Sequence, residues 1–255
     1  MGGFHSSNSS AGGTPPPPDF VAALDALEAR IQAACNAAGR SRDDVTLVAA
    51  SKTVPPEWVR EAFDAGIRDF GENKVQEAAA KIPLAPSAIR WHFIGHLQSN
   101  KAKHAIHLFS TLHAVDSVAL VETLSALSEE SGLRPGMMLH VNLAGEASKS
   151  GIAAGALFPV VEAALASPLP LTGLMTLPPF DPNPEHTRKY FAQLRELRDQ
   201  AEREFGVSLP HLSMGMSHDF EAAILEGATH IRVGSLLFGG RPKPKPQRDP
   251  TTDDD

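Results

Sequence analysis

Residues 45–53 read VTLVAASKT and predict a buried strand that ends in a lysine. Its first seven residues are apolar or small and carry no charge, Lys52 follows them directly, and Pro55 and Pro56 end any extended segment. A continuous apolar run predicts a strand of a parallel sheet that is covered on both faces. Lys52 then lies at the strand's C-terminal end, where apolar surroundings favour a neutral, nucleophilic amine. A lysine that extends to solvent and has no chemical role is the alternative.

Helical and extended patterns alternate along the rest of the chain, after an amphipathic helix that we predict over residues 19–38. Strands are predicted at residues 45–51, 67–71, 90–95, 111–115, 138–143, 171–177, 211–214 and 230–233. Helical patterns follow the first seven of them, at residues 57–65, 74–82, 98–108, 118–131, 154–166, 184–205 and 219–226. Eight strands with interleaved helices predict an α/β fold, a single (β/α)8 TIM barrel with an extra N-terminal helix. A doubly wound open sheet is the main alternative, but no G-x-G-x-x-G follows the first strand.

The two ends of the chain differ in composition from the part between them. Residues 1–18 are mostly Gly, Ser and Pro, and residues 242–255 are rich in Pro and charge. Segments with so little to bury are expected to be disordered tails. We therefore predict one domain, the barrel, over residues 19–241.

Composition limits the classes of partner. The formal net charge of −7 argues against a nucleic-acid partner, because no basic face is evident that could neutralise many phosphates. Cys35 is the single cysteine, which excludes an internal disulfide and suits a reducing compartment. No apolar run is long enough to cross a bilayer, and no signal peptide is recognisable. We expect a cytoplasmic protein with no membrane partner.

Barrels of this class carry their chemistry at the C-terminal ends of the strands, and phosphate groups commonly bind after strands seven and eight. Here residues 213–217, SMGMS, follow the seventh strand, and Gly234 and Ser235 follow the eighth. Backbone N–H groups and small hydroxyls in such loops suit a phosphorylated small molecule. The alternative is that Ser217 is an ordinary helix cap and that the glycines serve turns.

Arg232 lies within the last predicted strand, and strand alternation alone allows its side chain to point into the barrel or outward. An inward guanidinium needs an acceptor, because an unpaired buried charge is prohibitively costly. Few carboxylates are placed to provide one, and the ring nitrogen of a ligand would satisfy it.

Other polar groupings give no catalytic or metal site. Residues 217–219 read Ser-His-Asp, but consecutive residues at a helix start point in different directions and cannot relay a proton. His92 and His96 are four residues apart on a strand, too far to share a metal ion. We predict no metal.

Six multi-residue blocks resemble the pyridoxal phosphate homeostasis protein family, which has the barrel of the alanine racemase N-terminal domain. They are AASKT (49–53), FGENKVQE (70–77), WHFIGHLQSNK (91–101), GLMTL (173–177), LSMGMSHD (212–219) and RVGSLLFG (232–239). The resemblance runs from about residue 20 to residue 241, with the blocks in the family's order. Two positions depart from the family's pattern: Lys74 stands where an aromatic residue is usual, and Arg241-Pro242-Lys243 replaces a usual Arg-Asp-Tyr.

The resemblance implies that the chain binds pyridoxal 5′-phosphate (PLP), with Lys52 forming an internal aldimine. It further implies that Arg232 faces the pyridine nitrogen and that Ser213, Gly234 and Ser235 bind the phosphate. Residues implied to line the cofactor's surroundings are Asn73, His96, Met175 and Met214.

The resemblance also implies a role in PLP homeostasis without efficient turnover. Arginine cannot accept the proton that makes the cofactor ring a strong electron sink. Racemases of this class add a second domain with a tyrosine base, whereas Tyr190, the single tyrosine here, sits in a charged helical stretch. The expected partners are PLP and PLP-dependent apoenzymes, in a monomer or weak dimer. A racemase-like enzyme and a Schiff-base aldolase that works without PLP are the alternatives.

Overall fold

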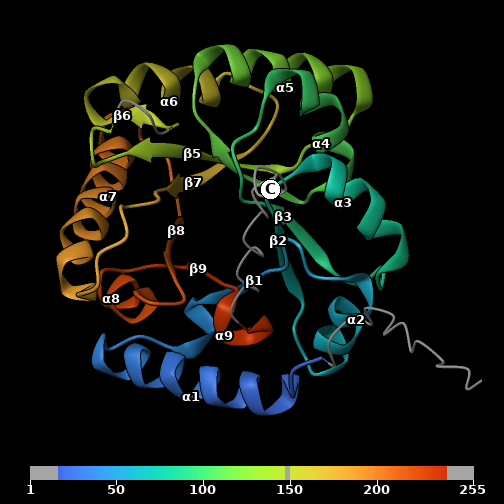
Figure 1. The fold of residues 1–255 in the computed structure, drawn as a ribbon. Helices are drawn as coiled ribbons and strands as arrows, with labels where there is room; N and C mark the ends of the chain where they lie inside the picture. The colour runs from blue at the N-terminus through green and yellow to red at the C-terminus, as the bar shows by residue number, and fades with distance from the viewer. Residues whose placement is uncertain (1–16, 147–149, 240–255) are drawn as a thin grey trace, which may run out of the picture.

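Parallel pairing joins eight strands into a closed ring in the computed structural model, which describes residues 17–146 and 150–239. The ring closes where the last strand pairs with the first, with Thr46 opposite His230 and Ala49 opposite Val233. The ring order is β1, β2, β3, β4, β5, β7, β8 and β9, with the helices outside it (Figure 1). The predicted barrel is therefore confirmed, and the open sheet is wrong.

The barrel strands lie close to the predicted positions. They are β1 Thr46–Ala50, β2 Asp69–Glu72, β3 Arg90–Phe93, β4 Thr111–Val115, β5 Gly136–Asn142, β7 Leu171–Met175, β8 His211–Met216 and β9 His230–Val233. A further strand of two residues, β6 (Ile152–Ala153), pairs with β5 and was not predicted.

The helices surround this ring. They are α1 Phe20–Ala37, α2 Pro56–Asp64, α3 Val75–Lys81, α4 Ala102–Leu108, α5 Val118–Ser131, α6 Leu157–Leu165, α7 Pro184–Phe205, α8 Phe220–Leu225 and α9 Ser235–Phe238. The helix predicted over residues 98–108 begins instead with a 3₁₀ turn, Ser99–Lys101. The predicted N-terminal helix is present as α1, which packs against α8 and α9 (Figure 1).

Alternation along the strands separates an outer apolar layer from the inside of the barrel. Leu47, Phe70, Leu112 and other outward side chains form one cluster with the apolar faces of the helices. Polar side chains from several strands face the other way and are buried in the middle of the ring: Asp69, His92, His113, His140, Ser213, His230 and Arg232. The outer layer therefore holds the fold together, while the interior carries a polar core.

The predicted tails fall outside the described residues, apart from Pro17 and Pro18. Within the described residues, no helix is both long enough and apolar enough to cross a membrane.

Candidate functional site

A cavity of about 670 Å³ opens at the C-terminal ends of β1, β8 and β9, the end where barrels of this type place their chemistry. Its volume lies in the range of small-molecule sites. Its lining combines apolar walls with a few polar groups: Ala50, Lys52, Thr53, Val54, Pro55, Trp58, Asn73, Ile94, Leu177, Met216, Ser217, His218, Arg232, Gly234, Ser235, Phe238 and Gly239. Five predicted site residues therefore share one cavity: Lys52, Asn73, Arg232, Gly234 and Ser235.

Lys52 follows β1 directly and is half-buried at the cavity wall. The next residue, Thr53, has a φ of 63° and is the one non-glycine residue with positive φ among the described residues. This conformation is uncommon for a β-branched residue, and such strain concentrates at functional sites. The backbone thus turns sharply just after Lys52, and the Thr53 hydroxyl donates to the Lys52 carbonyl at 2.6 Å.

A buried ion pair holds the backbone immediately before Lys52. Lys81 Nζ lies 2.6 Å from Glu72 Oε1 and donates to the Ser51 carbonyl at 2.7 Å. The Ser51 hydroxyl donates to the same Glu72 oxygen at 2.6 Å. Lys81 belongs to α3 and Glu72 to β2, so these contacts hold α3 and β2 against Ser51, the residue that precedes Lys52.

Arg232 points into the barrel, which resolves the choice that alternation left open. Its side chain donates to the Ser213 hydroxyl at 2.6 Å and to the Thr176 carbonyl at 3.0 Å. Burial lowers the pKa of Arg232 to about 10, with Asp219 opposing part of the change. No carboxylate among the described residues forms an ion pair with this guanidinium, which leaves it able to donate to a ligand.

Ser213 and Met214 are not among the lining residues, although both were predicted at the site. Ser213 is fully buried and accepts the hydrogen bond from Arg232, so it lies beneath Arg232 in the barrel interior. Met214 packs in the outer apolar layer, because it follows the inward-pointing Ser213 and successive side chains of a strand point to opposite faces. This placement suits Ser213 to support Arg232 rather than to contact a phosphate.

The remaining small polar groups gather at the loops after β8 and β9. The Gly234 N–H donates to the Ser217 hydroxyl at 3.2 Å, which links the two loops beside Ser235. A Cβ on Gly234 would lie 3.2 Å from the Ala50 carbonyl oxygen, tighter than an ordinary contact. Glycine thus lets the two strand ends approach each other at the cavity. Ser217 lies in the loop that the sequence offered for a phosphate, with a helix cap as the alternative, and it lines the cavity.

Asn73 and His96 were both expected near the ligand, but their positions differ. Asn73 lines the cavity, and its buried Oδ1 has no hydrogen-bond partner among the described residues. His96 is exposed, with Nδ1 3.2 Å from Asp116 Oδ2. Met175 is fully buried and does not line the cavity. A buried amide oxygen at a cavity wall is placed to accept a hydrogen bond from a group or water in the cavity.

Most of the other lining residues were not predicted at the site, and the larger side chains among them include Trp58, Met216, His218 and Phe238. Met216 and His218 lie within the SMGMSHD block, so position after β8 was a usable signal. Trp58 and Phe238 lie on α2 and α9, outside the strand ends, and both pack around Phe20 in this region. Ring centroids lie 6.3 Å apart for Phe20 with Trp58 and 5.7 Å apart for Phe20 with Phe238.

The chain is similar to known proteins over nearly all of its described length. The profile of the alanine racemase N-terminal domain matches residues 22–242. The pyridoxal phosphate homeostasis protein of Aquifex aeolicus is 46% identical over 214 residues, which cover 83% of this chain and 94% of that protein. The protein of the same name from Pseudomonas aeruginosa is 47% identical over 218 residues, covering 84% of this chain and 92% of that protein.

Solved structures agree with these matches. PipY of Synechococcus elongatus, solved without PLP, superposes with a TM-score of 0.78 at 36% identity, covering 87% of this chain and 100% of that one. The same protein solved with PLP bound gives a TM-score of 0.77. The shared barrel, together with relatives at this identity and coverage, shows that the chain belongs to the pyridoxal phosphate homeostasis protein family.

Proposed function

We propose that this protein binds PLP in the cavity at the ends of β1, β8 and β9, and that it stores and releases the cofactor without efficient turnover. The observation that carries the proposal is that Lys52 and Arg232, an amine and a buried guanidinium, line the same cavity. The PLP-bound structure of PipY, a relative with the same barrel, supports it.

The lining fits the chemistry of this cofactor. PLP carries an aldehyde that reacts with amines, a pyridine nitrogen that accepts hydrogen bonds, and an anionic phosphate. Arg232 offers only donors, so it suits an unprotonated ring nitrogen. The buried Asn73 amide has unused hydrogen-bonding capacity at the same wall. The Lys52 amine, the Arg232 guanidinium and the small polar loops after β8 and β9 thus line the same cavity.

Three parts of the lining hold the cofactor in this proposal. Lys52 supplies the covalent anchor. Arg232 donates to the ring nitrogen and, because it keeps its own proton, holds that nitrogen unprotonated. Ser217, Gly234 and Ser235 offer hydroxyl and backbone groups to the phosphate from the two loops that the bond between Gly234 and Ser217 ties together.

The same lining is poor in groups that move protons. Among the described residues it contains one histidine, His218, and no carboxylate or tyrosine. Tyr190 lies on α7, outside this cavity. With His218 as the one histidine of this lining, and with the ring nitrogen facing arginine, carbanion chemistry on an amino acid is weakly supported. The name that the relatives share supports a role in keeping PLP available.

The test is covalent labelling with a matched lysine control. Purified protein is incubated with PLP, reduced with borohydride and analysed by peptide mass mapping. We expect a phosphopyridoxyl adduct on Lys52, lost in the Lys52→Ala variant and retained in Lys74→Ala, whose side chain is 69% exposed on the neighbouring loop. An adduct distributed over exposed lysines, with Lys52 unlabelled, would refute the assignment.

Turnover and release are tested on the same preparation. We expect no racemisation of amino acids above the rate of free PLP, and transfer of bound PLP to a PLP-dependent apoenzyme supplied in excess. Racemisation that disappears in the Lys52→Ala variant would instead identify an enzyme, with His218 the first candidate for its proton-transfer group.

A further inference from the structure

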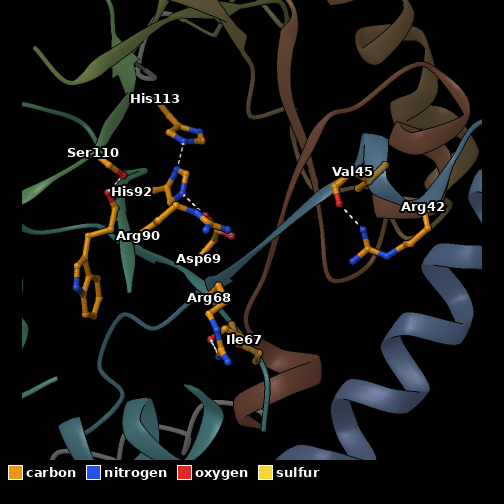
Figure 2. Close-up of polar contacts among 10 residues, drawn as sticks. Arg42, Val45, Ile67, Arg68, Asp69, Arg90, His92, Ser110 and His113 are labelled. Carbon is orange, nitrogen blue, oxygen red and sulfur yellow. Dashed lines mark hydrogen bonds and ion pairs between the residues drawn. The ribbon is translucent and has the colours of Figure 1, made fainter. Parts of the chain in front are cut away.

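A line of hydrogen bonds starts at the N-terminal end of the barrel and runs inward. Arg90, whose side chain is 61% exposed, donates to Asp69 Oδ1 at 2.7 Å and to Oδ2 at 2.5 Å. His92 Nε2 lies 3.0 Å from Asp69 Oδ1, and His92 Nδ1 lies 2.9 Å from His113 Nε2. Figure 2 shows this segment, with the two imidazole rings joined end to end and Asp69 beneath them.

The line continues across the barrel to the cavity. His113 Nδ1 lies 2.8 Å from the Ser213 hydroxyl, which in turn lies 2.6 Å from Arg232 NH1. Strand β4 does not pair with β8, so the contact between His113 and Ser213 crosses the barrel interior. An unbroken series of contacts therefore joins a carboxylate at one end of the barrel to the guanidinium that lines the cavity at the other.

The donors and acceptors in this line favour one direction of hydrogen bonding, in which each group from Arg232 onward donates to the next group toward Asp69. Arg232 can only donate, so Ser213 accepts from it, and the described residues offer the Ser213 hydrogen one acceptor, His113 Nδ1. His113 then carries its proton on Nε2 and donates to His92 Nδ1. His92 likewise carries its proton on Nε2 and donates to Asp69. The opposite direction would leave the buried Ser213 hydrogen without an acceptor, which is costly.

We infer that Asp69, His92, His113 and Ser213 are positioning residues for Arg232: the carboxylate fixes both histidine tautomers, and these aim the Ser213 oxygen at the guanidinium. The inference rests on the proposed function only in taking Arg232 as the group that faces the cofactor. The line of hydrogen bonds itself is a property of the protein without PLP.

The surroundings of His113 favour the neutral ring that this line of hydrogen bonds requires beside Ser213. Burial, with the neighbouring His92 next in effect, lowers the pKa of His113 well below its usual range. Burial acts to raise the pKa of Asp69, but hydrogen bonds from His92 and Arg90 outweigh it and hold that pKa below its usual range. The terminal acceptor is thus ionised and the ring beside Ser213 is neutral at pH 7.

The first test needs no ligand. Long-range ¹H–¹⁵N correlation of the histidine rings, in protein freed of PLP at pH 7, distinguishes the two neutral tautomers from each other and from imidazolium. We expect His92 and His113 both to carry the proton on Nε2. A proton on Nδ1 of His113, or an imidazolium at either ring, would overturn the inference.

The second test removes the terminal acceptor. In Asp69→Leu the present tautomers leave the His92 Nε2 hydrogen without an acceptor, whereas the reversed tautomers leave the Ser213 hydrogen without one. Because these two costs are similar, we expect the Nδ1–H tautomer to become populated at both rings together. Asp69→Asn keeps an oxygen in reach of His92 and is expected to keep both tautomers. If Asp69→Leu folds and leaves the His113 ring signals unchanged, Asp69 does not set the tautomer of His113 and the inference fails.

The third test measures the effect on the cavity. Ser213→Ala removes the acceptor of Arg232, and we expect PLP to bind about tenfold more weakly, the loss of one charge-assisted hydrogen bond. Ser213→Thr restores the hydroxyl and should restore affinity. Ser128→Ala, which deletes a buried hydroxyl that donates at 2.7 Å to the Leu133 carbonyl, is the control and should bind PLP normally.

The outcomes separate the two proposals. If the unmodified protein binds no PLP while the tautomers are as expected, the proposed function fails, but the assigned direction of the line of hydrogen bonds is supported. If PLP binds Lys52 but Ser213→Ala binds it as tightly as the unmodified protein, the cofactor site stands and the positioning role is refuted.

Discussion

Replacing Lys81 with methionine should destabilise the protein far more than the loss of an ordinary surface lysine. The Lys81 side chain is 8% exposed and its partner Glu72 is fully buried. In Lys81→Met the Glu72 carboxylate keeps one of its two hydrogen bonds, from the Ser51 hydroxyl, and loses its compensating charge. An uncompensated buried charge of this kind costs about 3–5 kcal/mol.

That magnitude is large against the total stability of a typical domain, about 5–15 kcal/mol. For a domain of this size it corresponds to a melting temperature lower by about 6–20 °C. The matched control is Lys74→Met, because Lys74 forms an exposed pair with Glu77 at 2.8 Å. Exposed pairs contribute at most about 1 kcal/mol, so this variant should melt close to the parent.

Urea denaturation of protein freed of PLP measures these differences without stabilisation by ligand. The double variant Glu72→Met/Lys81→Met removes both charges, and it should recover most of the loss because a buried pair can be replaced by apolar side chains at little cost. Recovery should be incomplete, since the Ser51 carbonyl still loses its donor. The reasoning is refuted if Lys81→Met is no less stable than Lys74→Met, or if the double variant is no more stable than Lys81→Met.

Two further predictions concern stability. In Gly173→Ala the new Cβ would lie 1.9 Å from the His211 carbonyl oxygen, so β7 and β8 must separate, and we expect a loss of about 3 kcal/mol or more in urea denaturation. Gly155→Ala, with no atom within 4 Å of its Cβ, should stay within about 0.5 kcal/mol of the parent, and equal effects would contradict the prediction. Burial lowers the pKa of His140 to about 4 and of His230 to about 3, so in acid the unfolded chain binds more protons than the folded one. The contribution of these two neutral rings to the free energy of unfolding is fully present above about pH 6.5. It is lost on acidification toward pH 4 for His140 and pH 3 for His230, by up to about 1.4 kcal/mol per pH unit for each ring. His140→Gln should give a shallower decline, and an unchanged slope would refute the assignment.

The fold was largely predictable because its strands are buried runs with clear ends. The predictions at residues 111–115 and 230–233 coincide with β4 and β9, and those at residues 118–131 and 184–205 coincide with α5 and α7. Elements of two or four residues, such as β6 and α9, are too short to show a period.

The residues of the site were predictable only where their position at the end of a strand is enough to place them at the cavity. Strand ends indicated Lys52, Gly234 and Ser235, which share the cavity. The direction of Arg232 and the depth of Ser213 depend on the phase and register of several strands around the ring, which a single sequence does not contain. The same holds for the contact between His113 and Ser213, two residues of strands that do not pair.

The closure of the ring between β1 and β9 has a consequence for biosynthesis. Lys52 follows the first strand to leave the ribosome, whereas Arg232 lies on the last, so the two groups come together only when both strands are available to pair. Domains fold as units during synthesis, and a nascent chain without β9 lacks one wall of the cavity. On the proposed function, a growing chain therefore lacks the complete cavity, and tight binding of PLP begins only once β9 has paired with β1.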